Sequence, residues 1–543
     1  MRGDLTGAPS MVTGHVLTMD PSRPRAEALG IKDGRVVAVG SRAEVTAAVG
    51  ANAEHHDFGT ATIIPGLIDS HNHMLWTAMQ RRLVDLTECR SVDEIVAQVK
   101  AFADTHPDLQ WIVSGAGWHV ESLRERRYPT RQELDSACPD RPVYLPRVGH
   151  AAVANTAALK RAGIDRNTPE PEGGRIVRDS AGDPTGVLLE PPAFNPVGDL
   201  VPPMALADRA EALVEMQALY NAAGITGVID PGLTADEMSV YQSLWARDAL
   251  TVRTVAMPLA QIDDDPERML AKIRTWGPRT RFGDAWLKLG GIKLFLDGGA
   301  SLNTALMREP YPDESCQCGI QVTHSTTFHR LAELCAETGW SLGVHAVGGK
   351  AIDIALEVFA DVHERHPIND LRFSLIHAYL WPTKENMETA RRLDVGVATQ
   401  AAMQYQFAPL LTRRFGKDMM GAATPVKSWL DGGVIVGGGS DSPITPYQPL
   451  LGMWHAVTRY VDDLGEVVGA EEAVTPEQAL AMYTTGAAWL AFSEHEKGRL
   501  SPGFLGDWVA LSDDPTTIDP MAIRDIDVLA TAVGGRIVHG GPR

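Results

Sequence analysis

The sequence has few cysteines for its length, and this scarcity excludes one way of holding a fold together. It contains 5 cysteines in 543 residues. A small, odd number in so long a chain argues against the disulfide framework of small secreted domains. Cys316 and Cys318 form a lone Cys-x-Cys without the second pair that a cysteine-type zinc site needs. We therefore predict an ordinary loop there.

Long apolar runs and an excess of basic residues are also missing. No run of about 18 apolar residues occurs, so we expect no membrane span. The first ten residues, MRGDLTGAPS, lack the apolar core of a signal peptide, so a cytoplasmic protein is expected. The 69 acidic and 49 basic residues give a formal net charge of -20, which argues against nucleic-acid binding. A small-molecule substrate remains as the expected partner, and a homodimer is left open.

Both ends of the chain read as short strands separated by turns. Asp33-Gly34 lies between two β-rich runs, which is a strong hairpin signal. Residues 508–511 and 528–533 repeat this style near the other end. We predict a small β-sandwich built from residues 1–64 and 491–543.

The middle of the chain, residues 65–490, alternates apolar strand-like runs with helical stretches, which indicates βαβ units and a parallel sheet. Eight runs are found, the number that a (β/α)₈ TIM barrel needs. The gap after the first run is too long for one loop, so we predict an insertion over about residues 85–205. The eight runs are Thr62–Asp69, Gly227–Asp230, Val252–Pro258, Leu287–Leu296, Ser341–His345, Arg372–His377, Val395–Thr399 and Val434–Gly438.

A His-x-His pair, His71 and His73, ends the first apolar run in the segment PGLIDSHNH. Residues two apart on a strand point to the same side, so both imidazoles can reach one metal ion. Imidazole suits zinc and its neighbours. The pair alone is weak evidence, because buried histidines often occur by chance.

Three later runs also end in residues that can bind a metal. They end at His345, His377 and Asp441, which are spaced 32 and 64 residues apart along the chain. Those steps match about one and two βα units. Because the carboxyl ends of barrel strands carry the active site, the sequence predicts one metal site at that end. The alternative is a set of unrelated buried histidines bonded to the backbone.

Lys293 lies in the apolar run LGGIKLFLDGG. Burial disfavours a charged amine, and a neutral amine can take up carbon dioxide as a carbamate. A carbamate could bridge two metal ions. The alternatives are a lysine that reaches solvent or one that pairs with Asp297.

Together these segments resemble the amidohydrolase superfamily, and most of all its family 3 branch, typified by N-substituted formamide deformylase. The likeness covers nearly the whole chain, although each short motif is unspecific. It rests on PGLIDSHNH, PTRQELDSACPDRPVYLPRVGHAAVANTAAL, TGVLLE, GGIKLFLDGGA, HAVGGKAI, LIHAYL, GGGSDSPI, VTPEQALAMYTTGAAWL and GRLSPGFLGDWVAL.

The resemblance implies roles for six residues. His71 and His73 would bind one metal, and Lys293 would be the carboxylated bridging ligand. His345 and His377 would bind a second metal, and Asp441 would be both a ligand and the proton shuttle. One or two divalent ions are compatible with the pattern, with Zn²⁺ the expected ion.

The expected reaction is cleavage of a C–N bond, in an amide, N-formyl or N-acyl compound, by metal-activated water. The same site could instead cleave a carbamate or ester, deaminate a cyclic amidine or decarboxylate its substrate, so these alternatives stay open. A non-catalytic scaffold is disfavoured by the full ligand set. For substrate binding we predict Asp297 and, in the insertion, where a structural role as caps is equally plausible, His119, His150, Asn155 and Glu190.

Overall fold

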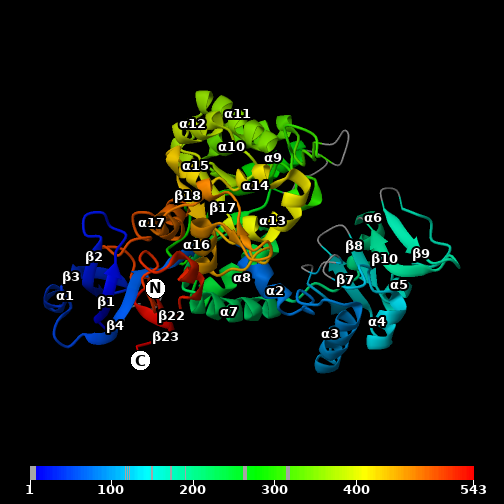
Figure 1. Cartoon of the computed structure of the whole chain (residues 1–543), viewed down its shortest axis with the longest axis horizontal. Helices are drawn as coiled ribbons and strands as arrows, with labels where there is room; N and C mark the ends of the chain where they lie inside the picture. Colours follow the sequence, from blue (N-terminus) through cyan, green and yellow to red (C-terminus); the bar gives the residue numbers. More distant parts are fainter. Residues whose placement is uncertain are drawn as a thin grey trace. The chain divides into compact units, whose positions relative to one another are not determined.

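The chain folds into two compact units (Figure 1). One comprises Met1–Met74 with Val214–Arg543, and the other comprises Leu75–Leu213. The predicted insertion, about residues 85–205, lies within the second unit. The computed structural model describes residues 8–115, 118, 120, 123–147, 151–171, 174–189, 191–260, 266–312 and 318–542.

The first unit contains two neighbouring parallel sheets in a TIM-barrel-like arrangement. One has the order β13-β12-β11-β5 and the other β14-β15-β16-β17-β18. A bridge between Leu259 and Lys293 links the sheets, and the Ser70 amide donates to the Gly438 carbonyl at 2.9 Å where they meet again. The strands are β5 (Leu67–Asp69), β11 (Ile225–Leu233), β12 (Arg253–Pro258), β13 (Leu287–Leu289), β14 (Ile292–Phe295), β15 (Leu342–Ala346), β16 (Ser374–His377), β17 (Gly396–Thr399) and β18 (Val436–Gly438).

Six of the eight predicted runs contain one parallel strand each, and the other two are divided. The run Thr62–Asp69 is broken at Gly66, and only its last three residues join β11. A Cβ at Gly66 would lie 2.3 Å from Thr226 Oγ1, so no side chain fits there. The run Leu287–Leu296 is divided between the two sheets. The Gly290 amide donates a hydrogen bond to the Ala256 carbonyl on β12, whereas the Ile292 amide donates to the Ser341 carbonyl beside β15.

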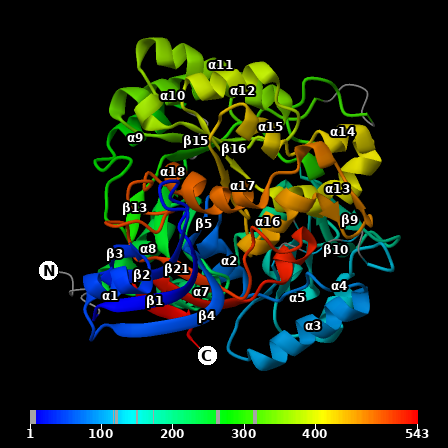
Figure 2. The ribbon, with the colours of Figure 1, turned by 60° about the vertical axis from the view of Figure 1, so that its left-hand side comes forward.

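Helices cover the outside of the parallel strands, as expected where both faces of a parallel sheet are buried. Figure 2 shows α10, α11 and α12 beside β15 and β16. No described helix is both long and apolar enough to cross a membrane. The helices are α7 (Leu206–Ala222), α8 (Ala235–Ala246), α9 (Pro266–Arg274), α10 (Ser325–Thr338), α11 (Gly349–Arg365), α12 (Lys384–Arg392), α13 (Ala401–Phe415), α14 (Lys417–Gly421), α15 (Val426–Asp431), α16 (Pro449–Thr458), α17 (Pro476–Ala481) and α18 (Ala487–Leu490).

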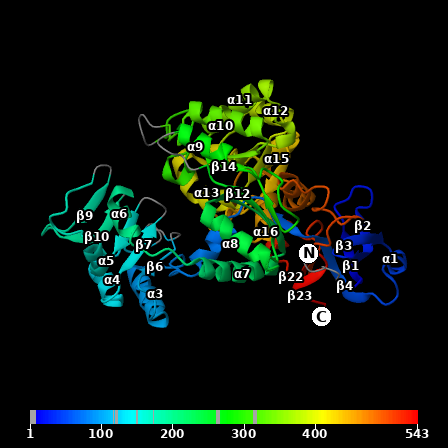
Figure 3. The ribbon, with the colours of Figure 1, turned by 180° about the vertical axis from the view of Figure 1, so that it is seen from behind.

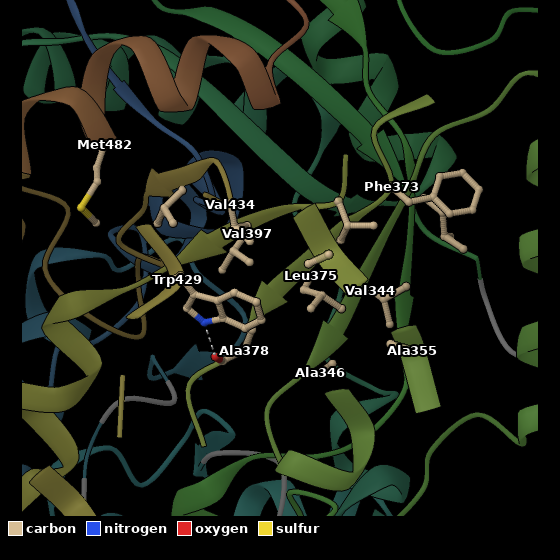
Figure 4. Close-up of a cluster of buried hydrophobic side chains, with 14 of the residues drawn as sticks. Val344, Ala346, Ala355, Phe373, Leu375, Ala378, Val397, Trp429, Val434 and Met482 are labelled. Atoms are coloured by element: carbon tan, nitrogen blue, oxygen red, sulfur yellow. Dashed lines mark hydrogen bonds between the residues drawn. The ribbon is translucent and has the colours of Figure 1, made fainter. Parts of the chain in front are cut away.

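The main core lies between these helices and the strands (Figure 4). Val344, Leu375 and Val397, from three adjacent strands, are fully buried. Each such side chain contributes about 1.5–3 kcal/mol when it leaves water. The indole N–H of Trp429 donates to the Ala378 carbonyl at 3.2 Å, so even this large ring has its polar atom satisfied. The core therefore holds the strand ends in fixed positions.

The two chain ends pair within one seven-stranded sheet of the order β23-β22-β21-β4-β1-β2-β3. The hydrogen-bonded ladders join these seven strands into a single sheet, whereas the sequence predicted a β-sandwich, in which two sheets pack face to face. Asp33 and Gly34 have positive φ, as the predicted hairpin turn requires. The strands are β1 (Ser10–Leu17), β2 (Arg25–Lys32), β3 (Arg35–Gly40), β4 (Glu54–Pro65), β21 (Trp508–Leu511), β22 (Val528–Val533) and β23 (Arg536–Gly540), with α1 (Arg42–Val49) following β3.

The second unit has its own sheet, of the order β6-β7-β8-β10-β9, and its own core. Figure 3 shows α3, α4 and α5 grouped beside this sheet. The helix α2 (Met74–Gln80) begins at the boundary between the units, since Met74 belongs to the first unit and Leu75 to the second. The elements are β6 (Ile112–Val113), β7 (Val143–Arg147), β8 (Ala151–Ala154), β9 (Arg175–Arg178), β10 (Pro184–Leu189), α3 (Val92–Thr105), α4 (Arg131–Ala137), α5 (Thr156–Arg161) and α6 (Pro191–Gly198).

The start of α4 provides a first testable prediction. Glu133 pairs with Arg127 at 2.7 Å and closes a capping box with Thr130. The Arg127 hydrogen bond, joined by those of Thr130, lowers the pKa of Glu133 from 4.5 to about 2. We expect Glu133→Ala to destabilise this unit by about 1 kcal/mol at pH 7 in urea unfolding.

The pH dependence of that effect has a definite sign. Because the folded pKa is depressed, the stabilisation is fully present above pH 4.5 and is lost as the pH falls towards 2. The difference between wild type and Glu133→Ala should therefore shrink on acidification. Glu88→Ala, at a side chain that is 88% exposed, serves as the control. A difference that grows as the pH falls contradicts this account.

Candidate metal centre

All six predicted ligand residues lie in the first unit, on or just after parallel strands. His71 and His73 follow β5, and Asp441 follows β18. Lys293 is on β14, His345 is on β15 and His377 is the last residue of β16. The imidazole ring of His71 lies 5.2 Å from that of His73 and 5.1 Å from that of His377, and the rings of His345 and His377 are 4.5 Å apart. The fold thus brings the predicted histidines together.

His71, His73 and Asp441 form the tightest group. Nε2 of each histidine lies 3.1 Å from Oδ1 of Asp441, and one ligand atom from each residue lies within 4.8 Å of the others. His71 is buried, yet neither of its ring nitrogens makes a hydrogen bond with the described residues. An unsatisfied buried imidazole is costly, and a metal ion would satisfy it. Imidazole and carboxylate are also ligands that divalent ions accept, so the group fits a divalent metal.

The hydrogen bonds of the other histidines fix which nitrogen carries the proton. Nδ1 of His73 lies 3.1 Å from the Pro231 carbonyl, which can only accept a hydrogen bond. Nδ1 of His377 lies 2.7 Å from Oε1 of Gln400, whose amide group donates to Ala398. Both rings therefore keep Nε2 as the lone-pair atom. Nε2 of His345 instead faces the Gly298 carbonyl at 3.3 Å, which leaves its Nδ1 as the lone pair.

Burial keeps most of these histidines in the neutral form that binds metals. It lowers the pKa of His71 to about 4 and that of His345 to about 3, and it takes the pKa of His377 well below its usual value. Burial also acts to lower the pKa of His73, but Asp441 outweighs it and the net shift is upward. Burial raises the pKa of Asp441, yet contact with His71 and His73 holds it well below its usual range. Asp441 is thus ionised at neutral pH.

Lys293 is fully buried, as its apolar sequence context predicted. Its amine lies 4.8 Å from the centre of the Phe295 ring and makes no ion pair with the described carboxylates. Burial lowers the pKa of Lys293 to about 7, although Asp441 and Asp297 oppose the shift. A large share of the amine is therefore neutral at physiological pH, as carbamate formation requires.

Two of the ligand residues have strained backbones. His377 has φ of 77° and Asp441 has φ of 56°, in the left-handed region that residues with a Cβ rarely adopt. Each residue in this conformation raises the free energy of the folded chain by on the order of 1–3 kcal/mol, and the conformation persists where the surrounding structure imposes it. The positive φ values fall at the last residue of β16 and three residues after β18, and both side chains lie close to His71.

Asp69 joins the two strand ends that carry His71 and Asp441. Its carboxylate accepts hydrogen bonds from the His71 amide at 3.2 Å and from the Asn72 side chain at 2.9 Å. It also accepts from the Ser440 amide at 3.0 Å and the Ser440 hydroxyl at 2.6 Å. Burial raises the pKa of Asp69 to about 6 despite these bonds. One buried carboxylate therefore holds the loop after β5 against the loop after β18.

We expect Asp69→Asn to weaken metal binding by about 10- to 100-fold, the usual cost of losing a residue that orients ligands. The new amide would turn a donor towards Asn72 and Ser440, which are donors themselves. Competition with a chelator measures the affinity, and the Co²⁺ absorption spectrum reports the ligand geometry. Asp236→Asn, on the exposed start of α8, is the matched control. Unchanged affinity and an unchanged spectrum in Asp69→Asn contradict this role.

The structure gives a mixed picture of the residues predicted to bind substrate. Asp297 lies close to the site, with Oδ1 3.8 Å from Nε2 of His345. Its carboxylate accepts backbone hydrogen bonds from Leu306, Val347 and Gly348, so it anchors two loops. His119, His150 and Glu190 lie outside the described residues.

Asn155 is buried and caps α5. Its Oδ1 accepts from the Val143 and Ala158 amides, and its amide group donates to the Cys138 and Arg141 carbonyls. These bonds use its whole hydrogen-bonding capacity for local structure. They support the capping alternative for this residue.

Two polar residues that lie against the predicted ligands were not included in the predicted site. Asp230 lies on β11, with Oδ1 4.0 Å from Nδ1 of His73, and its other oxygen accepts from the Tyr241 hydroxyl. Gln400 directly follows β17 and orients His377. Both stand where an apolar run ends, so the signal that identified the other ligands was present for them too.

Comparison with known proteins places this geometry in a family. The model of the amidohydrolase family matches residues 57–539. The protein of Bacillus subtilis (strain 168) named amidohydrolase YtcJ is 31% identical over 536 residues, which cover 97% of this chain and 98% of that protein. N-substituted formamide deformylase of Arthrobacter pascens is 30% identical over 545 residues, covering 97% of both chains.

A solved structure agrees with these sequence relatives. The crystal structure of an uncharacterised metal-dependent hydrolase from Pyrococcus furiosus matches with a TM-score of 0.76 and 25% identity, and covers 94% of this chain and 100% of its own. Its match along the chain agrees with the TIM-barrel-like arrangement of the parallel strands. With the family model matched over most of the sequence, the chain belongs to the amidohydrolase family and is a hydrolase.

Proposed function

We propose that this protein is a metal-dependent hydrolase that cleaves a C–N bond in a small amide, N-formyl or N-acyl compound. The observation that carries the proposal is the group of His71, His73 and Asp441, with both Nε2 atoms 3.1 Å from one carboxylate oxygen. A relative of similar length is named as a deformylase, which supports the choice of bond. The Pyrococcus furiosus relative, named as a metal-dependent hydrolase, supports the need for a metal.

His71, His73 and Asp441 would hold one divalent ion, and His345, His377 and a carboxylated Lys293 would complete a site for a second. When bound, such an ion acts as a Lewis acid, lowering the pKa of water from about 15.7 towards about 7 and polarising a carbonyl. Zn²⁺ is the ion that this set of imidazoles and carboxylates suits best.

Asp441 is the residue that moves the proton. Because its carboxylate is ionised, it can accept a proton from the attacking water as the new C–O bond forms. It then delivers that proton to the nitrogen as the C–N bond breaks, so that the amine leaves neutral. The turned backbone at Asp441 and the Asp69 hydrogen bonds keep the carboxylate in place for both transfers.

Lys293 would contribute as a carbamate. Its neutral amine would add to carbon dioxide and lose one proton, which replaces the amine with a carboxylate on a buried side chain. We expect protein equilibrated with ¹³C-bicarbonate to show one carbamate signal by ¹³C NMR that is absent from Lys293→Met. A spectrum without that signal, from metal-loaded protein, contradicts the carboxylated lysine.

A substrate screen tests the proposed function. The protein is stripped with a chelator, reloaded with Zn²⁺, and assayed on N-formyl, N-acyl, carbamate, ester and cyclic amidine compounds. We expect hydrolysis of an amide-type compound that disappears on stripping and returns on reloading. Activity restricted to esters, carbamates or amidines would replace the proposed bond with another, and activity that resists stripping would overturn the metal requirement.

A further inference from the structure

Phe295 is a large apolar side chain that the fold leaves exposed beside the metal centre. It is the last residue of β14, and it is 36% exposed, whereas its neighbours Leu294 and Leu296 are completely buried. Phe295 and Lys293 are two residues apart on one strand, so both side chains point to the same face. The centre of the Phe295 ring lies 4.8 Å from the Lys293 amine and 5.1 Å from the centre of the His345 ring. The exposed ring therefore forms part of the wall of the metal centre.

The position of this ring suggests a role in binding. Single exposed apolar side chains are common on protein surfaces, but Phe295 stands against two of the predicted metal ligands. Sites for small molecules combine apolar walls with a few polar groups. A molecule held at the metal centre would cover the ring and remove its apolar surface from water, which is favourable.

The structure leaves space beside Lys293 for such a molecule. Gly232 on β11 faces the stem of this lysine, and a Cβ added at Gly232 would lie 4.0 Å from Cγ of Lys293. No other atom of the described residues would come within 4 Å of that Cβ, apart from those of Gly232 and its chain neighbours. The wall next to Phe295 is thus not filled by another side chain from β11.

Phe295 and Asp441 stand on opposite sides of the parallel strands. Starting from β14, the strands β15, β16 and β17 precede β18 in one sheet. In the other direction, β13, β12, β11 and β5 lead back to β18 through the hydrogen bond between Ser70 and Gly438. Asp441 follows β18, so a small molecule that lies between the two residues has one end at Asp441 and the other at Phe295.

We propose that Phe295 determines specificity by packing on an apolar acyl group, so that the substrate is an N-acyl compound whose acyl part is alkyl or aryl. This inference rests on the proposed function and narrows its substrate class. Asp441 gives its proton to the leaving nitrogen, so the amine part of the substrate lies on the side of β18. The acyl part, across the scissile bond, then lies towards β14 and the ring. A formyl group carries only hydrogen there and would leave the ring uncovered.

The first test compares the 4-nitroanilides of acetic and butyric acid with the Zn²⁺-loaded full chain. Both release 4-nitroaniline, so their kcat/KM values differ only through the acyl group. We expect butyryl to exceed acetyl by about tenfold, since each buried CH₂ group contributes about fourfold. Phe295→Ala should reduce this ratio to about threefold or less, and Phe295→Leu, which keeps an apolar side chain, should retain most of it. Phe282→Ala, at a phenylalanine that is 63% exposed, is the matched control and should keep the ratio of the wild type.

The second test measures binding without turnover. Acetohydroxamate and butyrohydroxamate carry the same two acyl chains on a group that binds metal ions, and calorimetry gives their Kd values. We expect the butyryl compound to bind about tenfold tighter in wild type, and the difference to disappear in Phe295→Ala. Each ratio compares two compounds in one preparation, so a smaller folded fraction does not change it. Metal content and thermal unfolding show that each variant is folded.

The outcomes separate this inference from the proposed function. Equal Kd values of the two hydroxamates in wild type, or the same ratio in Phe295→Ala as in wild type, overturn the role of Phe295. A preference for N-butylacetamide over N-methylacetamide that Phe295→Ala removes also overturns it, because the amine would then pack on the ring. If no anilide or acetamide is hydrolysed while the hydroxamates show the expected ratios, the proposed function falls and the acyl-binding role of Phe295 is supported.

Discussion

Replacing Asp441 with asparagine is expected to lower kcat by about 10²- to 10⁴-fold, the contribution that a positioned acid and base makes. The asparagine keeps the shape of the side chain but cannot take up a proton. The contacts that matter are the two 3.1 Å approaches of His71 and His73 to Oδ1, which hold the carboxylate ionised and in place. The measurement is kcat and KM on the compound found in the substrate screen.

Metal content distinguishes the two roles of Asp441. Loss of activity with the metal retained assigns the residue to proton transfer, and loss of both assigns it mainly to metal binding. Asp431→Asn, at an exposed carboxylate on α15 that pairs with Lys427, makes the same chemical change away from the site and should leave kcat unchanged. Near-normal kcat in Asp441→Asn would remove this residue from the mechanism.

The metal-binding group could be predicted because the end of a buried strand has a simple sequence pattern, an apolar run followed by a polar residue. His71, His345, His377 and Asp441 each stand where an apolar run stops, and the carboxyl ends of parallel strands meet at one place. The same pattern was present at Asp230, the last residue of the second run, and at Gln400, directly after the seventh run. They were missed because an isolated Asp or Gln has many roles, whereas repeated histidines suggest a metal at once.

Other features of the site depend on contacts between distant residues and left no local signal. The hydrogen bonds between Asp69 and Ser440 join residues 371 positions apart, so only the folded chain shows that Asp69 connects the loops after β5 and β18. The positive φ values of His377 and Asp441 are imposed by their surroundings, against the preference of both residue types. The break at Gly66 also follows from a neighbour, Thr226, on another strand.

The ion pair between Arg253 and Asp507 is expected to make a large contribution to stability. Arg253 at the start of β12 and Asp507 before β21 are joined by two hydrogen bonds of 2.7 and 2.9 Å, and both side chains are almost completely buried. Asp507 also accepts from the Gly534 amide. Removing one partner leaves the other charge buried without a counter-charge, so Arg253→Met should lower the free energy of unfolding by about 3–5 kcal/mol.

Hydrogen exchange of the β12 and β21 segments in rising urea measures this loss within the first unit. The control is Arg25→Met, because Arg25 is 57% exposed in its pair with Asp514 and should contribute less than about 1 kcal/mol. The double variant Arg253→Met, Asp507→Leu tests the cause. If the loss of stability in Arg253→Met comes from the unpaired buried carboxylate of Asp507, replacing Asp507 as well should restore part of that stability. Apolar residues often replace a buried ion pair at little cost. A double variant less stable than Arg253→Met would show instead that Asp507 acts mainly through Gly534, by holding the turn between β22 and β23.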